Sequence, residues 1–401
     1  MKFLKNYSVF LESLEQDTED MYLPTYEECL EIVSSNPDMY FYETKTEIGQ
    51  YKISMFNYML APWQNFKTPI PGKPHMTADE LRGLCFVFNP DGTLFKRYLL
   101  MNKFWNINQI PDSMYHVIQD YKILNVMDKV DGSITSFIRV PDGRVFAKSK
   151  MSLISDQAVA ANKIYQENKD INRFVNWCLD EDIVAIFEYV SPRNKIVLDY
   201  ENDDLILLRM RDNKTGEYLD PGDYWDLLGG INIAKFEDET TLDDLIELSK
   251  TITNREGWVI GFTNGKMVKL KGDWYMQRHR LFTSLLNREN DVIDLILDEK
   301  MDDVIAQLTD ADQSKRDFID GIIEIVNKYI SNTYTNVQDM LRNYDGSKKD
   351  FALKYNGVPF FSICMSVINR NEDIISLIKD DLRRKTKDLN QARKWVENNS
   401  K

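Results

Sequence analysis

The sequence has little that would build a histidine-rich zinc site, a disulfide framework or a membrane span. Its three histidines, His75, His116 and His279, stand apart, and none pairs with another at zinc-ligand spacing. The four cysteines form no C-x-x-C pair, which favours a reduced cytoplasmic protein. No apolar run approaches the length of a membrane span, and residues 1–12 lack the features of a signal peptide. We therefore expect no membrane association.

Two common nucleotide-binding signatures are also missing. No G-x-G-x-x-G and no Walker A sequence occurs, so Rossmann-type and P-loop binding lack support. The net charge of −14 argues against unspecific polyanion binding by the whole surface. It leaves room for a local basic groove, because the distribution of charge decides such binding.

The composition is that of a globular protein, and the sequence pattern changes once along the chain, from strand patterns to helical periodicity. The 401 residues, 43% of them apolar, are enough for two domains with separate cores. Up to about residue 282, strand patterns and turn signals predominate, with a few capped helices between them. From about Arg280, apolar residues recur three and four positions apart, which predicts a helical domain over 283–401. The sequence thus predicts an α+β domain, 1–282, of antiparallel sheets with flanking helices, followed by an all-helical domain.

The chain is organised around Lys129, in the stretch Asp-Lys-Val-Asp-Gly-Ser of residues 128–133. Residues 134–140 are rich in β-formers, so we expect the lysine on a short loop that enters a strand. Gly132 would allow close backbone approach. A lysine in such a place can act as an amine nucleophile when its surroundings lower its pKa. The alternative for this short motif is a solvated hairpin turn.

Two further stretches carry charge where a strand is predicted. Glu188 interrupts the apolar run 183–190, and a carboxylate inside a buried strand is costly unless it is paired or lies in a site. Residues 256–262 and 267–270 flank an Asn-Gly turn and predict a hairpin. Lys269 and Lys271 share one face of it, and Glu256 lies on the partner strand. The hairpin either presents a carboxylate and two amines together or has a lysine-rich outer face.

Taken in order, these motifs resemble the covalent nucleotidyltransferase superfamily of ligases and capping enzymes. Several of them are similar to the phage RNA ligase 1 family, the T4 RNA ligase 1 type. The resemblance covers about residues 50–305, and the ordered set is more specific than any member of it. The stretches that carry it are residues 58–61, 81–86, 102–106, 129–132, 148–152, 185–190, 255–260 and 267–275.

The resemblance gives roles to residues that would otherwise be read as structural. Tyr58, by itself a packing aromatic, becomes a nucleotide contact, and Glu188 a partner of the ribose or a metal. Arg82, by itself a surface charge, and Lys103, by itself a snorkelling lysine, become contacts to the nucleotide phosphates. Lys148 and Lys150 share a strand face that lines a phosphate track or is simply solvated.

The family's chemistry implies three transfers at phosphorus. Lys129 attacks ATP to form lysyl-AMP, the AMP moves to an RNA 5′-phosphate, and a 3′-hydroxyl then displaces it. Positive charge from Arg82, Lys103, Lys269 and Lys271 would stabilise the phosphates and favour the neutral amine of Lys129. The site set that the resemblance implies is completed by Gly132 at the nucleotide, Glu256 and Tyr275 near the reacting groups, and Asp131, Glu256 and Asp302 as neighbours of Mg²⁺ or Mn²⁺.

The implied partner is RNA with 5′-phosphate and 3′-hydroxyl ends, with a cleaved transfer RNA anticodon loop as the suggested substrate. The helical domain would supply specificity for that RNA, and its basic cluster 383–387 is either a solvated helix face or a contact to it. The implied setting is the cytoplasm of an infected bacterial cell, and we expect a monomer. Rival readings are a DNA ligase or capping enzyme, which the helical texture opposes, and a non-catalytic RNA-binding relative.

Overall fold

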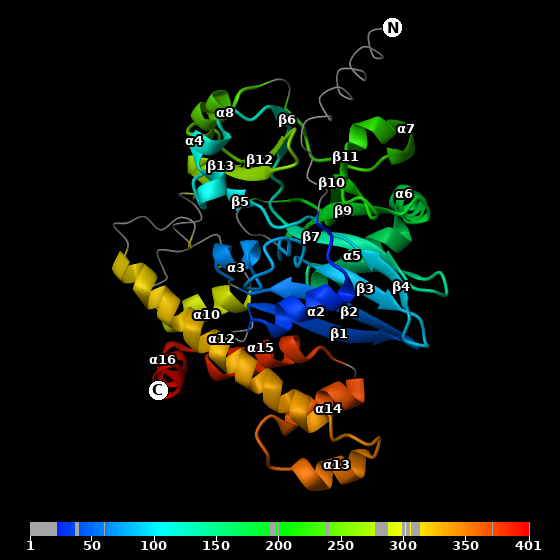
Figure 1. Ribbon diagram of the computed structural model, residues 1–401, viewed down its shortest axis with the longest axis vertical. Coiled ribbons are helices and arrows are strands. Elements are labelled where there is room, and N and C mark those ends of the chain that lie inside the picture. Colours follow the sequence, from blue (N-terminus) through cyan, green and yellow to red (C-terminus); the bar gives the residue numbers. More distant parts are fainter. Residues whose placement is uncertain are drawn as a thin grey trace. The chain divides into compact units, whose positions relative to one another are not determined.

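The computed structural model shows a mixed α+β chain with antiparallel sheets and a helical C-terminal region, which confirms the predicted fold class (Figure 1). None of the described helices is long and apolar enough to cross a membrane. The structure describes residues 22–400 apart from residues 37–39, 60, 193–197, 199, 238–239, 277–287, 299–300, 302–304, 306–312 and 371.

The chain folds into two compact units, each built from separated segments. Unit 1 contains residues 1–24, 99–137 and 156–277. Unit 2 contains residues 25–98, 138–155 and 278–401, so the helical C-terminal region is grouped with an N-terminal part of the chain. The predicted division into 1–282 and 283–401 stays a prediction.

The first sheet of unit 1 has the strand order β5–β13–β12–β6. These strands are β5 (Trp105–Asn106), β13 (Met267–Lys271), β12 (Gly257–Phe262) and β6 (Ile123–Asp128). Strand β12 pairs antiparallel with both neighbours, and β5 runs parallel to β13. The predicted hairpin is therefore present, and Trp258 and Ile260 of its first strand are fully buried.

A second sheet has the order β11–β10–β9–β7–β8. Its strands are β11 (Tyr218–Leu219), β10 (Asp204–Asp212), β9 (Ile183–Val190), β7 (Ser133–Arg139) and β8 (Val145–Ser149). Strand β7 starts in unit 1 and ends in unit 2, to which β8 also belongs. Because β9 pairs antiparallel with both β7 and β10, its apolar residues are buried as the run 183–190 predicts.

Side-chain caps mark the starts of two helices of unit 1. Asn168 caps α6 (Lys169–Asp180) and Thr241 caps α8 (Leu242–Ser249) with its side chain, and each satisfies backbone N–H groups of the first turn. The cap at Thr241 is a complete capping box with Asp244. The other short elements are α5 (Asp156–Glu167), η1 (Pro111–Ser113), α4 (Tyr115–Ile118), η3 (Pro221–Tyr224) and α7 (Trp225–Leu228).

Unit 2 contains an antiparallel sheet of order β1–β2–β3–β4. Helix α2 (Tyr26–Ser34) precedes it, capped by Thr25 as predicted. Residues 62–74 contain the short helix α3 (Trp63–Lys67), whose buried Phe66 packs on Phe41 and so orders the segment. The strands are β1 (Phe41–Ile48), β2 (Tyr51–Tyr58), β3 (Leu84–Phe88) and β4 (Leu94–Tyr98).

The C-terminal region of unit 2 is helical in its described residues, as its periodicity predicts. Its core includes Ile293, Ile322 and Ile378, and the same apolar cluster contains Tyr42 of β1 and Met59. The helices therefore share a core with residues from the sheet of unit 2. They are α10 (Glu289–Leu297), α12 (Gln313–Leu341), α13 (Lys348–Tyr355), α14 (Phe361–Arg370), α15 (Ile374–Lys385) and α16 (Leu389–Asn399).

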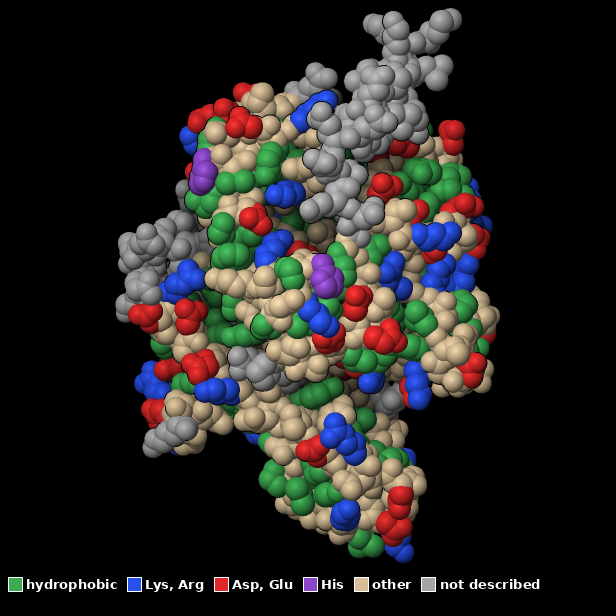
Figure 2. Space-filling view, viewed as in Figure 1, with side chains coloured by type: hydrophobic (Ala, Val, Ile, Leu, Met, Phe, Trp, Pro, Cys, Tyr) green, Lys and Arg blue, Asp and Glu red, His purple; other side chains and the backbone are tan. Residues whose placement is uncertain are grey.

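The basic cluster at the end of α15 is compensated by acidic neighbours. Arg383 pairs with Asp298, and Lys385 lies 2.7 Å from Asp381. On the face shown in Figure 2, basic and acidic side chains are likewise interspersed. These pairs favour the solvated-face interpretation of residues 383–387 over an RNA contact.

Candidate active site

Lys129 lies directly after β6 and before β7, in the loop that the sequence predicts. Its backbone N–H donates to the carbonyl of Gly257 at 2.9 Å, which fixes the loop against β12. Its side chain is 22% exposed, so the amine is partly desolvated and still accessible. The Nζ atom lies 2.8 Å from Oε2 of Glu256. The lysine is therefore held in an ion pair at the edge of a buried region.

Glu256 is shared between two lysines. Its side chain is 2% exposed, and its second oxygen, Oε1, lies 3.0 Å from Nζ of Lys271. The hairpin register explains this, because Gly257, the next residue, pairs with Lys271 across the ladder. Gly257 has φ +140°, and a Cβ there would lie 2.0 Å from the carbonyl of Leu270. Only glycine lets the two strands approach closely enough to form this lysine–glutamate–lysine group.

Asp131 is buried and organises a second part of the site. Its Oδ1 accepts a hydrogen bond from the Tyr275 hydroxyl at 3.0 Å, and its Oδ2 accepts one from the Leu198 N–H at 2.8 Å. Its own backbone N–H donates to the Tyr200 hydroxyl at 3.2 Å. Asp131 thus joins residues that are about 70 and 144 positions away in the chain. These bonds fix the loop that presents Lys129.

Glu188 lies on β9 next to this loop. A Cβ at Gly132 would lie 2.9 Å from Cγ of Glu188 and 2.4 Å from the carbonyl of Tyr189, so the backbone approaches as closely as the glycine predicts. Burial raises the pKa of the Tyr200 hydroxyl, and the carboxylates of Asp131, Glu188 and Glu256 raise it further. All three carboxylates therefore act electrostatically on one hydroxyl group.

Three lysines of the predicted site lie over aromatic rings. The Nζ of Lys103 is 4.4 Å from the centre of the Trp105 ring, and that of Lys269 is 5.2 Å from the Phe104 ring. Lys271 also contacts the Tyr275 ring, at 5.5 Å. Aromatic faces attract cations and restrict their side chains without neutralising them. Lys103 is largely buried in this arrangement. Its burial excludes the interpretation as a snorkelling lysine, whose ammonium group would reach bulk water.

Arg255 connects the strand of the nucleophile with the strand of Glu256. Its Nε donates to Asp128 at 3.0 Å, and its second terminal nitrogen lies 2.6 Å from Glu237. Glu237 also accepts from the indole N–H of Trp258 at 3.0 Å. The hydrogen bond from Trp258, together with Arg255, lowers the pKa of Glu237. The planar guanidinium of Arg255 therefore links Asp128, the residue before Lys129, to Glu237.

The remaining predicted residues lie in unit 2 or outside the described residues. Tyr58 is buried against Phe66, with Nζ of Lys150 4.8 Å from its ring centre. Arg82 precedes β3, and its charge acts on Lys148. Lys148 is completely buried, so the solvated-face alternative is wrong for it. Asp302 lies outside the described residues.

Whether unit 1 can hold a divalent ion depends on the carboxylates of Asp131 and Glu256. Among the described residues, no group of three or more carboxylate, histidine or cysteine side chains is placed to hold one. Each of the four oxygens of these two carboxylates already has a lysine or hydrogen-bond donor as partner. Their chemistry suits Mg²⁺ or Mn²⁺, which proteins often hold with one or two carboxylates and substrate phosphates. The residues thus fit an ion that arrives with a phosphate ligand.

Sequence reasoning missed Tyr200, Arg255 and the burial of Lys148. Tyr200 follows a stretch without recognisable periodicity, so no local signal marks it. Arg255 immediately precedes Glu256. Its position next to a predicted site residue was the one signal in the sequence that could have marked it. For Lys148, no local signal marks the burial, because alternation along β8 (Val145–Ser149) gives the face of a side chain but not what covers that face.

Comparisons with known proteins agree with the motifs. Residues 80–275 match the model of a family described as RNA ligase. A putative RNA ligase of Thermovibrio ammonificans is 27% identical over 293 residues, covering 71% of this chain and 72% of that protein. RNA ligase 1 of Bacteriophage TS2126 is 25% identical over 240 residues, covering 58% of each. The chain thus spans less than two thirds of that phage relative.

Two solved structures of RNA ligases give partial matches. An archaeal ATP-dependent RNA ligase matches with a TM-score of 0.47 and 12% identity, over 81% of this chain and 84% of that one. A Naegleria gruberi RNA ligase mutant with ATP and Mn matches with a TM-score of 0.36 and 18% identity, over 45% and 58%. The resemblance to phage RNA ligases that the ordered motifs predict is confirmed by the family match, and residues 80–275 carry the sequence pattern of the RNA ligase family.

Proposed function

We propose that the protein is an ATP-dependent RNA ligase in which Lys129 carries AMP. The observation that supports this most directly is the group formed by Lys129, Glu256 and Lys271, with N–O distances of 2.8 and 3.0 Å. It places an accessible amine beside a buried carboxylate that can take its proton, and beside a second cation for phosphate charge. The family match to RNA ligases supports RNA as the proposed substrate.

In the first step, the Lys129 amine forms a bond to the α-phosphorus of ATP, and the bond to pyrophosphate breaks. The sequence alone suggested that surrounding cations make this amine neutral, but its direct partner is a carboxylate. An ammonium group has no free electron pair, so the amine must lose a proton before it attacks. Oε2 of Glu256 lies within hydrogen-bond reach to accept it. Lys103, Lys269 and Lys271 then supply the fixed positive charge that a transferring phosphoryl group needs.

In the later steps, an RNA 5′-phosphate oxygen displaces the Lys129 nitrogen and takes the AMP. A 3′-hydroxyl then attacks the activated 5′-phosphate, forms the phosphodiester bond and releases AMP. Tyr275 lies over Lys271 and bonds Asp131, so it positions both residues during these transfers. We assign nucleotide contacts to Glu188 and Gly132 in unit 1, and to Tyr58 and Arg82 in unit 2.

The divalent ion is proposed as part of the metal–ATP substrate. Bound Mg²⁺ or Mn²⁺ would neutralise phosphate charge, and Asp131 and Glu256 are the carboxylates of unit 1 that we propose would hold it. As biological substrate we propose an RNA break with 5′-phosphate and 3′-hydroxyl ends, such as a cleaved transfer RNA anticodon loop in an infected bacterial cell. The helical region is proposed to select that RNA, and the protein to act as a monomer. Asp302 remains a proposed neighbour of the metal and lies outside the described residues.

Labelling with ATP tests the nucleophile. The wild-type protein incubated with α-labelled ATP and Mg²⁺ should acquire a covalent label that acid or hydroxylamine releases. Lys129→Ala should remain unlabelled, whereas Lys163→Ala, which changes an exposed helix lysine, should label normally. A wild-type protein that stays unlabelled with either metal would overturn the proposal and favour a non-catalytic RNA-binding relative.

The polynucleotide substrate is tested separately. The labelled protein, freed of ATP, should transfer AMP to a single-stranded RNA with a 5′-phosphate and then seal it to a 3′-hydroxyl end. The same sequence as DNA should react more slowly at both steps. Equal or faster sealing of DNA would make the protein a DNA ligase.

A further inference from the structure

A groove in unit 1 lies apart from the residues assigned to catalysis. It has a volume of about 920 Å³ and is lined by Lys122–Val126 on β6, by residues 231–237, and by Asp220, Gly222, Trp225 and Thr240. Lys129, Asp131, Glu188 and Glu256 are not among its lining residues. The volume is in the range of sites that hold a nucleotide-sized ligand.

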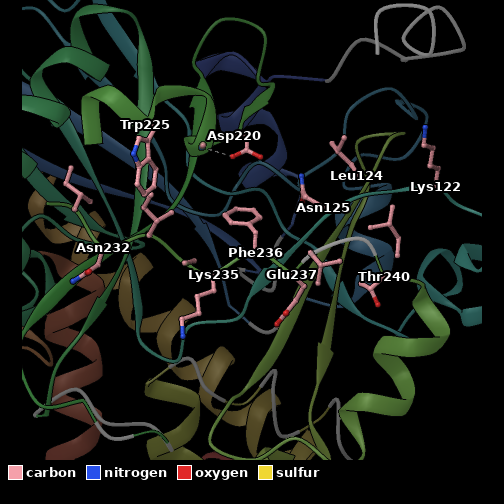
Figure 3. Close-up of a pocket in the computed structure, with 16 residues that line it drawn as sticks. Lys122, Leu124, Asn125, Asp220, Trp225, Asn232, Lys235, Phe236, Glu237 and Thr240 are labelled. Atoms are coloured by element: carbon pink, nitrogen blue, oxygen red, sulfur yellow. Dashed lines mark hydrogen bonds between the residues drawn. The ribbon is translucent and has the colours of Figure 1, made fainter. Parts of the chain in front are cut away.

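The groove exposes large apolar side chains that a folded protein normally covers. The Trp225 side chain is 71% exposed and that of Leu124 is 52% exposed. Phe236 lies between the two ends of the groove, with Trp225 at one end and Lys122 at the other (Figure 3). The Phe236 ring is fixed from below by the guanidinium of buried Arg209, 4.8 Å from its centre. Flat exposed rings beside a groove are the surfaces on which unpaired bases stack.

The acidic and basic side chains that line the groove differ in whether they have partners within the protein. Both carboxylates that line it are engaged: Asp220 accepts the Gly222 N–H at 2.8 Å, and Glu237 pairs with Arg255 at 2.6 Å. Lys122 and Lys235 are exposed, and neither forms a direct ion pair with a described residue. They therefore remain available to an anionic ligand.

The end near Trp225 is acidic, because Asp223 and Asp226 flank this residue in the chain. An uncharged base suits that end, whereas phosphates suit the exposed ammonium groups of Lys122, at the opposite end, and of Lys235, on the Trp225 side of Phe236 (Figure 3). A ligand with a base and a phosphate at different places matches both ends, whereas a purely anionic or purely apolar ligand matches one.

The groove is connected to the nucleophile by a single strand. Residues 122–126 line the groove, and β6 continues through Asp128 to Lys129. At about 3.3 Å per residue, the four positions from Asn125 to Lys129 span roughly 13 Å. A nucleic acid strand whose end reacts at Lys129 therefore reaches the groove within a few nucleotides.

From these observations we infer that the groove binds an unpaired segment of the RNA substrate, with one base stacked on Trp225 and the adjoining phosphates at Lys122 and Lys235. The inference rests on the proposed RNA ligase function and adds a contact that lies away from the reacting ends. It predicts that the enzyme recognises a single-stranded nucleotide a few positions from the junction, in one of the two RNA strands.

The test combines protein and RNA changes. Trp225→Ala should raise the KM for single-stranded RNA in ligation roughly tenfold, because one stacked base contributes that much. It should leave the rate of lysyl-AMP formation unchanged, and Trp225→Phe should restore most of the RNA affinity. Leu353→Ala, at a position 75% exposed on α13, is the surface control. Abasic sites moved along each RNA strand should locate one position whose loss weakens wild type but adds nothing in Trp225→Ala.

The phosphate contacts have a separate readout. Replacing Lys122 and Lys235 with Gln should lower the slope of log affinity against log salt by about 1.4, since each single-strand contact contributes about 0.7. Lys163→Gln should not change it. The inference fails if Trp225→Ala leaves the KM for RNA within twofold of wild type, a result expected if the groove binds a protein instead. If wild type proves inactive with ATP, the same variants measured by RNA-binding anisotropy still decide whether the groove binds RNA.

Discussion

A buried lysine in unit 2 gives a prediction whose magnitude follows from the structure. Lys148 in β8 is completely buried, and its Nζ donates to the Ser149 carbonyl at 3.3 Å. Burial lowers its pKa from 10.5 to about 8, and the positive charge of Arg82 acts in the same direction. At about 1.4 kcal/mol per pH unit, keeping this lysine charged costs the folded state about 3 kcal/mol at pH 7.

Lys148→Met retains the volume and removes the charge. After subtracting roughly 1 kcal/mol for the lost hydrogen bond, we expect the variant to be about 2 kcal/mol more stable at pH 7. The unfolded chain binds more protons than the folded one between pH 8 and 10.5, so wild-type stability rises with pH across that window. The advantage of the variant should therefore disappear as the pH approaches 10.5.

Urea unfolding of both proteins at a series of pH values measures this difference. Lys163→Met, at an exposed helix position, should show a small difference from wild type that does not vary with pH. The reasoning is refuted if Lys148→Met is less stable than wild type at pH 7, or if its effect is the same at pH 7 and pH 10.5. Either result would mean that the ammonium group has a compensating partner in the folded protein.

Three further substitutions test the candidate site. Glu256→Gln should slow lysyl-AMP formation at least 100-fold in single-turnover labelling, because the proton acceptor of Lys129 is lost; a rate within threefold of wild type would remove Glu256 from that role. Gly132→Ala should cost about 2 kcal/mol in urea unfolding because its Cβ would lie 2.4 Å from the Tyr189 carbonyl, whereas Gly321→Ala, in open space on α12, should be neutral or stabilising. Arg255→Gln should lower the rate of lysyl-AMP formation about tenfold with little change in the KM for ATP, and Arg255→Lys should recover only part of it, since the fork to Asp128 and Glu237 needs a guanidinium; equal activity of Arg255→Gln and wild type would show that the fork is only structural.

Local sequence predicts the parts of the site in which the number of residues between two positions determines how their side chains lie. The Asn-Gly turn between β12 and β13 sets a register, and that register brings Lys271 to Glu256. Gly132 marks a close approach because no other residue would fit. The helix that Thr241 caps follows for the same reason, since a cap acts on backbone groups two or three residues away.

The parts that could not be predicted depend on residues far apart in the chain. Tyr200 bonds a residue 69 positions away, and the Arg255 side chain reaches one 127 positions away. Alternation along β8 shows that Lys148 and Lys150 share a face, but it does not show what covers that face. Burial is a property of the whole fold, so a lysine pattern typical of a solvated edge also occurs in the interior.

The interleaved segments of the two units have a practical consequence for dissecting the protein. The backbone passes from one unit to the other at residues 24–25, 98–99, 137–138, 155–156 and 277–278. A truncated chain that stops near residue 282 would keep the lysine–glutamate–lysine group but lose every helix that packs with Tyr42 and Met59. Such a fragment would expose that apolar surface to water, so loss of ligation after truncation would report aggregation as readily as loss of an RNA-binding element.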